Sequence, residues 1–314
     1  MAPCPDSVPQ GPFPRKIPCA PGTGRALQDL IRQKEDDAVS MTMEAGQFDQ
    51  AVRPAAVAGH FYPSEPGLLR TMVDKLLASA RSESVTGGPP PKAVIVPHAG
   101  YVYSGPIAAR AYVRLETALP AVRRVVLLGP AHRVGFYGIA APESACFETP
   151  LGYVAVDDAS VEQACTLPTV FRYEAAHAPE HSLEVQLPFL QRVLGDDFSL
   201  VPLVVGSAPS ADVARVLSML WGGSETVIVV SSDLSHHLDY RSAREVDEHT
   251  SAAIESFNDE AIAPGLACGR LPIQGLLQVA RQKGLRARRL DLRSSGDTAG
   301  PRERVVGYGA FEFG

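Results

Sequence analysis

The chain reads Ala93-Val94-Ile95-Val96 and then Pro97-His98, a short apolar run that ends in a histidine. The same arrangement recurs at residues 125–128, which are followed by His132, and at residues 227–230, which are followed by His236 and His237. Apolar runs rich in β-branched residues and closed by turn formers are typical of strands buried on both faces of a mostly parallel sheet. Ligands and metal ions bind beyond the carboxyl ends of such strands, so the histidines predict one shared site.

Composition places the chain among soluble globular proteins and excludes several partners. Of its 314 residues 45% are hydrophobic and 20% charged, and the formal net charge is −6. An acidic chain argues against nucleic acid or an anionic membrane as the main partner. One local cluster of arginines alternates with apolar residues, which predicts the solvent-facing side of a strand; its members are Arg286, Arg288, Arg289 and Arg293.

Three further sequence features limit the possible classes of protein. No stretch approaches the roughly 20 apolar residues that a membrane span requires. The N-terminus lacks a secretory pattern, so we expect a cytoplasmic protein. The five cysteines are scattered without a CxxC pair, which excludes a disulfide framework and a zinc knuckle.

The sequence divides near residue 50. Residues 1–50 are polar and rich in proline, and we expect a disordered extension there. Residues 51–314 alternate strand and helix patterns, which predicts one α/β domain with a mostly parallel central sheet flanked by helices. Segments 137–142 and 153–156 are expected to pair as a hairpin. A leucine stripe over residues 183–194 predicts a helix.

His98 and His132 occupy matching places after two predicted strands and supply two nitrogen ligands for a transition metal ion. His98 taken alone is equally well explained as a cap of the following helix. A third, anionic ligand has three candidates, Cys268, Glu184 and Asp233. Cys268 stands just before a predicted helix, whose dipole would lower the pKa of the thiol, although an ordinary buried cysteine is the commoner outcome.

Other polar residues lie close to this predicted site. His236 or His237 is suited to act as a neutral base, because both follow the third strand. His181 and Glu184 are three residues apart on the predicted leucine-striped helix. They either orient a metal-binding histidine or form a solvated face, and the local pattern does not separate these alternatives.

At these residues the sequence resembles the Memo family, including its bacterial Memo-like members named AmmeMemoRadiSam system protein B. The resemblance runs from about residue 52 to the C-terminus and rests on six motifs in family order. They are residues 53–63 (RPAAVAGHFYP), 97–101 (PHAGY), 128–132 (LGPAH), 181–190 (HSLEVQLPFL), 230–236 (VSSDLSH) and 268–273 (CGRLPI).

The resemblance implies a fold similar to that of class III extradiol dioxygenases, which use non-heme Fe(II). It also implies that His98 and His132 correspond to the two iron-binding histidines of those enzymes. Cys268 falls where they place a glutamate ligand, and His236 falls where they place the acid–base histidine. We therefore expect His98, His132 and Cys268 as metal ligands and His236 as the catalytic residue. A thiolate is softer than a carboxylate and changes the metal preference.

Two functions follow from the resemblance. The first is a protein with a redox metal ion, iron or copper, that acts as an oxidoreductase. The alternative is an inactive binding or adaptor protein that uses the old pocket for a peptide or metabolite. The family name also implies a radical-SAM protein and an AMMECR-domain protein as partners.

Overall fold

The structure, a computed structural model, describes residues 52–83 and 88–314. The predicted disordered extension at residues 1–50 lies outside the described residues. Within them, the main sheet has nine strands, and its centre has the order β2-β9-β3-β8. These four strands run parallel and are Ala93–Val96 (β2), Thr226–Ser231 (β9), Arg124–Pro130 (β3) and Ser199–Val205 (β8). The predicted α/β fold is confirmed, and all three apolar runs that end in histidines form neighbouring strands of this centre.

Antiparallel strands flank the parallel centre, so the sheet as a whole is mixed. On one side β12 (Val305–Phe313) pairs with β2 and is itself paired by β10 (His236–Leu238) and β11 (Ala287–Ser294). On the other side β4 (Ile139–Ala141) pairs antiparallel with β8, and β7 (Val170–Arg172) follows it.

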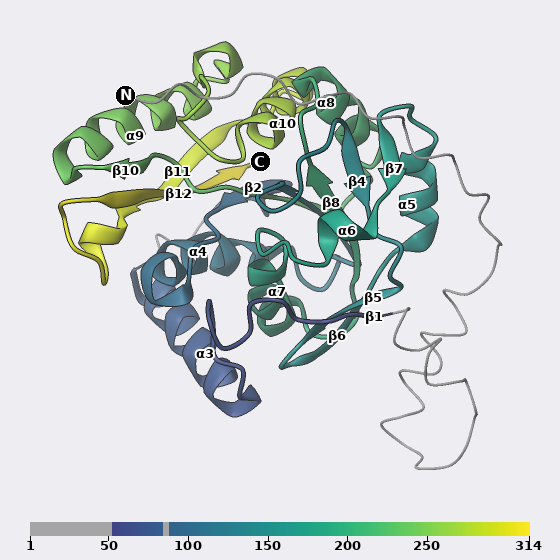
Figure 1. The fold of residues 1–314 in the computed structure, drawn as a ribbon, viewed down its shortest axis with the longest axis horizontal. Coiled ribbons are helices and arrows are strands. Elements are labelled where there is room, and N and C mark those ends of the chain that lie inside the picture. Colours follow the sequence, from purple (N-terminus) through teal and green to yellow (C-terminus); the bar gives the residue numbers. More distant parts are fainter. Residues whose placement is uncertain (1–51, 84–87) are drawn as a thin grey trace. The chain divides into compact units, whose positions relative to one another are not determined.

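Helices cover both faces of the sheet (Figure 1). On one face α4 (Tyr101–Leu115) contacts β2 and β12, and α3 (Pro66–Glu83) and α7 (Leu187–Leu194) pack on α4. The opposite face is covered by α8 (Ser210–Met219), α9 (Tyr240–Glu255) and α10 (Arg270–Gln282). The short helical elements are α5 (Asp158–Cys165), α6 (Glu174–His177), η1 (Glu116–Ala118), η2 (Glu184–Gln186), η3 (Asp259–Ala261) and η4 (Ser295–Asp297).

The predicted hairpin is wrong in its pairing. Residues 153–156 do not pair with 137–142; instead β6 (Gly152–Ala155) pairs antiparallel with β5 (Cys146–Thr149), and β1 (Val52–Arg53) joins β5. The three residues of β4 are fully apolar and buried, so they enter the main sheet between β8 and β7. A short apolar segment of this kind gives no indication of its partner in the sequence.

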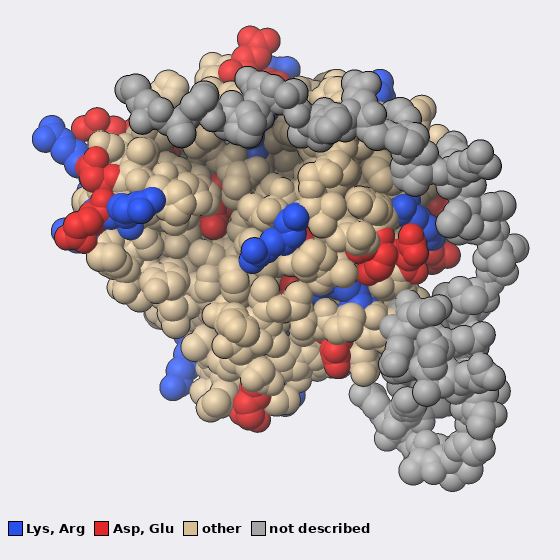
Figure 2. Space-filling model, viewed as in Figure 1, with Lys and Arg blue, Asp and Glu red and all other residues tan. Residues whose placement is uncertain are grey.

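Three of the four clustered arginines lie on β11, with Arg286 directly before it, and these three pair with acidic neighbours. Arg288 pairs with Glu312, Arg289 with Glu248, and Arg293 with Asp291. On the face seen in Figure 2, Lys and Arg side chains are scattered among Asp and Glu rather than gathered into one basic surface.

None of the helices that the structure describes combines the length and the apolar character needed to cross a membrane. A cytoplasmic location stays a prediction.

One buried ion pair fixes the first described segment to the middle of the chain. Arg53 Nη1 donates to Glu184 Oε2 at 2.5 Å, and both side chains are almost fully buried. Glu184 also accepts hydrogen bonds from the backbone N–H groups of Ala56 and Val57 and from the Tyr62 hydroxyl. None of the three predicted roles of Glu184 is correct: it is buried, its hydrogen bonds go to Arg53, Tyr62 and two backbone N–H groups, and it is not part of the imidazole cluster.

Replacing Arg53 by Met should lower the free energy of unfolding by about 3–5 kcal/mol, because it leaves the Glu184 carboxylate buried without its counter-ion. Urea denaturation in the presence of a chelator would measure this change. The matched control is Arg241→Met, which removes an exposed ion pair with Glu245 and should leave the stability nearly unchanged. Equal effects of the two substitutions would contradict the structural role assigned to Arg53.

Candidate metal centre

The strand order brings three loops together at the carboxyl edge of the parallel sheet. His98 follows β2, His132 follows β3, and β9 lies between these two strands. The loop that precedes α7 passes over the same edge and carries His181. Gly129 permits this approach, because a Cβ atom there would meet Ser182 Oγ at 2.7 Å.

The imidazoles of His98, His132 and His181 converge. One ring nitrogen of each lies within 4.8 Å of the others. The ring centroids of His132 and His181 are 4.7 Å apart, and His98 lies 5.1 and 5.5 Å from them, edge-on to both. Three convergent imidazoles are a common ligand set for a transition metal ion.

Hydrogen bonds determine which nitrogen of His98 carries its proton. His98 Nδ1 lies 2.8 Å from Ser231 Oγ. The Ser231 hydroxyl has one proton, and it donates that proton to the carbonyl oxygen of Ser182 at 2.6 Å. His98 Nδ1 must therefore be the donor to Ser231, which leaves Nε2 unprotonated and able to accept or coordinate. Burial, followed by the neighbouring His132 and His181, holds the pKa of His98 well below its usual range.

A buried side chain behind Ser231 supports this arrangement. Gln186 Nε2 donates to the carbonyl oxygen of Pro97 at 3.0 Å and to Ser231 Oγ at 2.8 Å. The Tyr112 hydroxyl donates to Gln186 Oε1 at 2.8 Å. The orientation of the Gln186 side-chain amide is thus fixed by hydrogen bonds to both its oxygen and its nitrogen. Because this amide donates to Ser231 Oγ, the only proton on that hydroxyl is the one given to Ser182.

Glu180 orients the other two histidines. Its carboxylate accepts hydrogen bonds from the backbone N–H groups of His132, His181 and Ser182 and from His132 Nδ1 at 3.0 Å. Burial favours the protonated acid, but these hydrogen bonds outweigh it and lower the pKa of Glu180 to about 2. The ionised carboxylate holds the proton of His132 on Nδ1 and leaves Nε2 bare, as metal-binding histidines require.

Of the three imidazoles, that of His181 has the fewest hydrogen bonds. Its Nδ1 lies 3.3 Å from Glu180 Oε1 but makes no hydrogen bond, although the atom is buried. Burial lowers the pKa of His181 to about 4, so the imidazole is neutral at pH 7. The buried His181 Nδ1 thus lies beside the Glu180 carboxylate without a hydrogen bond in the described chain, so the orientation of this ring is held less firmly than that of His98 or His132.

Cys268 reaches the edge of the cluster. Its Sγ lies 3.2 Å from His98 Nε2, and Gly269 allows the start of α10 to pack against Ser232. The predicted lowering of its pKa is wrong: burial and then the charge of Asp233 raise the pKa of the Cys268 thiol to about 12. The helix dipole is outweighed because the sulfur lies beneath the loop after β9.

Asp233 and His236 lie near the imidazole cluster but are not part of it. Asp233 Oδ1 accepts the backbone N–H of His98 at 2.8 Å, so this candidate ligand shapes the loop instead of joining the imidazoles. His236 Nδ1 lies 2.8 Å from the carbonyl oxygen of Leu234, which only accepts, so Nδ1 carries the proton and Nε2 is the basic nitrogen. Its charge contributes to the lowered pKa of His98, which places His236 near the cluster. His237 is exposed.

The structure thus brings together His98 and His132, as predicted, and adds His181 to them. The sequence suggests that His181 lies on one face of a helix. His181 precedes α7 and lies in a loop, because the helix begins only at Leu187. Glu180 and Ser231 were missed. The one signal for Glu180 is an acidic residue directly before a histidine; a single serine at a strand end gives none.

Comparison with known proteins identifies relatives across most of the chain. Residues 53–312 match the family model described as Memo-like protein. A "MEMO1 family protein" of Aquifex aeolicus is 37% identical over 270 residues, with 82% of this chain and 97% of that protein covered. Proteins of the same printed name in Ignicoccus hospitalis and Sulfolobus acidocaldarius are each 35% identical, over 83% and 84% of this chain and 98% and 99% of theirs.

In chelator-treated protein at neutral pH, His98 should carry its proton on Nδ1, because Ser231 accepts it there. Long-range ¹H–¹⁵N correlation spectra of histidine-labelled protein would distinguish the two ring nitrogens. The Ser231→Ala variant should lose the Nδ1–H form, while the spectrum of His236 stays the same. A His98 with its proton on Nε2 in the unmodified protein would refute the hydrogen-bond assignment.

Proposed function

We propose that this chain, which belongs to the Memo-like protein family, holds a redox-active metal ion, iron or copper, and acts as an oxidoreductase. The ligands in this proposal are the imidazoles of His98, His132 and His181. The thiol of Cys268, the third ligand expected from the sequence, contacts His98 and completes the donor set when it loses its proton.

The convergence of the three imidazoles carries this proposal. His98 and His132 have their Nδ1 protons bound by Ser231 and Glu180, which leaves Nε2 of each free to coordinate. Neutral imidazole with an adjacent sulfur donor suits copper, iron and zinc better than magnesium or calcium. Iron or copper, when bound, would supply the one-electron chemistry that these side chains lack.

The chain's own residues have distinct tasks in this proposal. Ser231 and Glu180 orient the ligands and keep them in the tautomer that coordinates. Phe61 lies against His181, with ring centroids 4.7 Å apart, and shields that side of the cluster from water. His236, whose Nδ1 proton is held by the Leu234 carbonyl oxygen, accepts or returns a proton at Nε2.

Elemental analysis of anaerobically purified protein should find close to one iron or copper ion per chain. His98→Ala, His132→Ala and His181→Ala should each weaken metal binding by more than about 100-fold, since losing an orienting partner alone costs about 10–100-fold. His249→Ala is the matched control, because His249 is exposed on α9 and should leave the metal content unchanged.

The variants also test whether His181 belongs to the ligand set beside Cys268. Loss of metal in Cys268→Ser but not in His181→Ala would replace His181 by Cys268 in the ligand set. Protein that is purified without metal and binds none on titration would overturn the proposal. It would leave the alternative of a binding or adaptor protein that uses this pocket.

His236→Gln should retain the full metal content, because His236 is assigned to proton transfer rather than to coordination. The measurement is the same elemental analysis, with the His98→Ala variant as the reference for loss. A His236→Gln protein as depleted of metal as His98→Ala would make His236 a ligand.

Partnership with a radical-SAM protein and an AMMECR-domain protein stays a prediction of the family resemblance. Purification of the tagged chain from its native host that recovers neither would count against it.

A further inference from the structure

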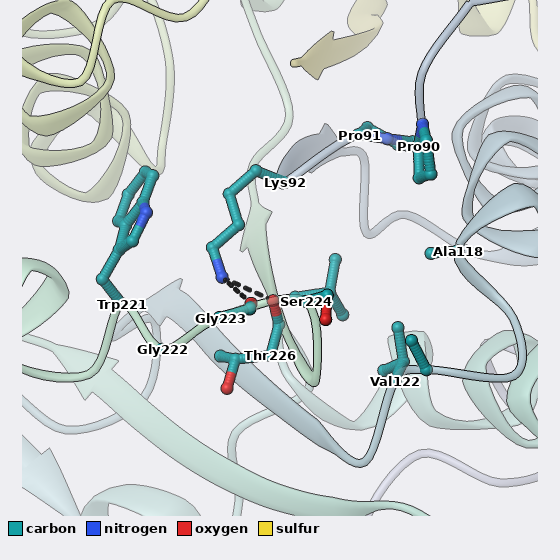
Figure 3. A pocket seen from close by; sticks show the side chains of 12 residues that line it. Pro90, Pro91, Lys92, Ala118, Val122, Trp221, Gly222, Gly223, Ser224 and Thr226 are labelled. Atoms are coloured by element: carbon teal, nitrogen blue, oxygen red, sulfur yellow. Dashed lines mark hydrogen bonds between the residues drawn. The ribbon is translucent and has the colours of Figure 1, made fainter.

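A pocket of about 410 Å³ lies at the amino ends of the central parallel strands, the edge opposite the imidazoles. The segments that precede β2, β9 and β3 line it (Figure 3). Strand β9 runs from Thr226 in the pocket to Ser231 beside His98, a length of about 16 Å. The pocket is therefore a separate site, and binding there does not depend on the metal ion.

The walls of the pocket are mostly apolar. They include Pro90, Pro91, Ala118, Val122 and Trp221. Small-molecule sites commonly combine apolar walls with a few convergent polar groups in volumes of roughly 300–1,000 Å³. The pocket is within this range and has room for a molecule with a compact apolar body.

Lys92 supplies the polar group. Its Nζ donates to the carbonyl oxygens of Gly223 at 2.8 Å and Thr226 at 2.6 Å, as the dashed lines in Figure 3 show. An ammonium group has three donors, and the third has no acceptor in the part of the chain that the structure describes. Burial lowers the pKa of Lys92 to about 8, because the charge is partly desolvated.

The charges around Lys92 favour an anion. Lys92 and Lys283 both lie over the ring of Trp221, at 5.5 and 5.8 Å from its centroid. Glu225 is the nearby acid: its Oε1 accepts hydrogen bonds from the Gly223 N–H and the Thr226 hydroxyl, and its charge acts on Lys92 from beyond ion-pair distance. Arg124 is paired with Asp157. Two lysines thus share one aromatic ring without a carboxylate within ion-pair distance among the described residues.

We propose that this pocket is a second binding site, for a small organic carboxylate with an aromatic or aliphatic body. The carboxylate accepts the third N–H of Lys92 and is attracted by Lys283. The apolar body packs against Trp221 and the prolines of the 90–91 segment. A neutral molecule of the same shape fills the apolar part but leaves the ammonium without its partner.

Trp221 is the one tryptophan in the chain, so its fluorescence reports directly on this pocket. The probe is 3-phenylpropanoate, and 3-phenylpropanol is its neutral counterpart. We expect a saturable change in tryptophan emission with the carboxylate and an affinity at least about tenfold lower for the alcohol, since a charge-assisted hydrogen bond is lost. No saturable change, or equal affinity for both probes, would overturn the proposal.

Variants locate the binding. Lys92→Met should weaken carboxylate binding at least about tenfold, and Lys92→Arg, which keeps the charge, should weaken it less. Lys75→Met is the matched control, because Lys75 is exposed on α3 and outside the pocket. Unchanged binding in Lys92→Met would refute the site.

Two further variants keep the test decisive. Lys283 is exposed, so Lys283→Gln should weaken binding without disturbing the fold even where Lys92→Met does not fold, and unchanged affinity there would count against the proposal. His98→Ala should bind the carboxylate as the unmodified protein does. Loss of binding in His98→Ala would assign the signal to the metal centre instead.

Discussion

The single proton of the Ser231 hydroxyl determines the chemistry of the carboxyl edge of the sheet. Because that proton is given to the Ser182 carbonyl, His98 must donate from Nδ1 and keep Nε2 bare. Gln186 and Tyr112 extend the chain of hydrogen bonds into the core, so the state of a ligand at the sheet edge is fixed by groups buried behind it. Satisfied buried networks of this kind give rigidity, whereas partly satisfied ones are costly.

The two ends of the central parallel strands carry side chains of different chemistry. At the carboxyl ends, His98 and His132 meet His181 and the carboxylate of Glu180 from the loop before α7, and the hydrogen bonds to Glu180 overcome the cost of its burial. The amino ends carry an apolar pocket with a single amine, Lys92. The short parallel strands between them are almost entirely buried, which keeps the two chemistries apart and limits their communication to a stiff sheet.

The parts of the fold that follow from local patterns were predictable, and the parts that follow from tertiary pairing were not. The apolar runs at 93–96, 125–128 and 227–230 predict buried strands on their own and put His98 and His132 just after two of them, but the strand order that brings the two histidines together could not be read from the sequence. The partner of β4 could not be predicted, because three apolar residues fit any neighbour. Glu184 was misassigned since its counter-ion, Arg53, is 131 residues distant. The pKa of Cys268 was predicted in the wrong direction, because burial by the loop after β9 is invisible in the sequence.

The place of β9 in the sheet has a consequence for the order of folding. β2 and β3 are close in sequence, yet they do not pair; β9, which starts at Thr226, separates them. Contacts between segments so distant along the chain form late. Closing the long loop between them costs conformational entropy, and this cost is offset only once the strands have paired. Until β9 is inserted, His98 has neither its Ser231 partner nor its final distance from His132. The imidazole cluster is therefore complete only when the centre of the sheet is complete.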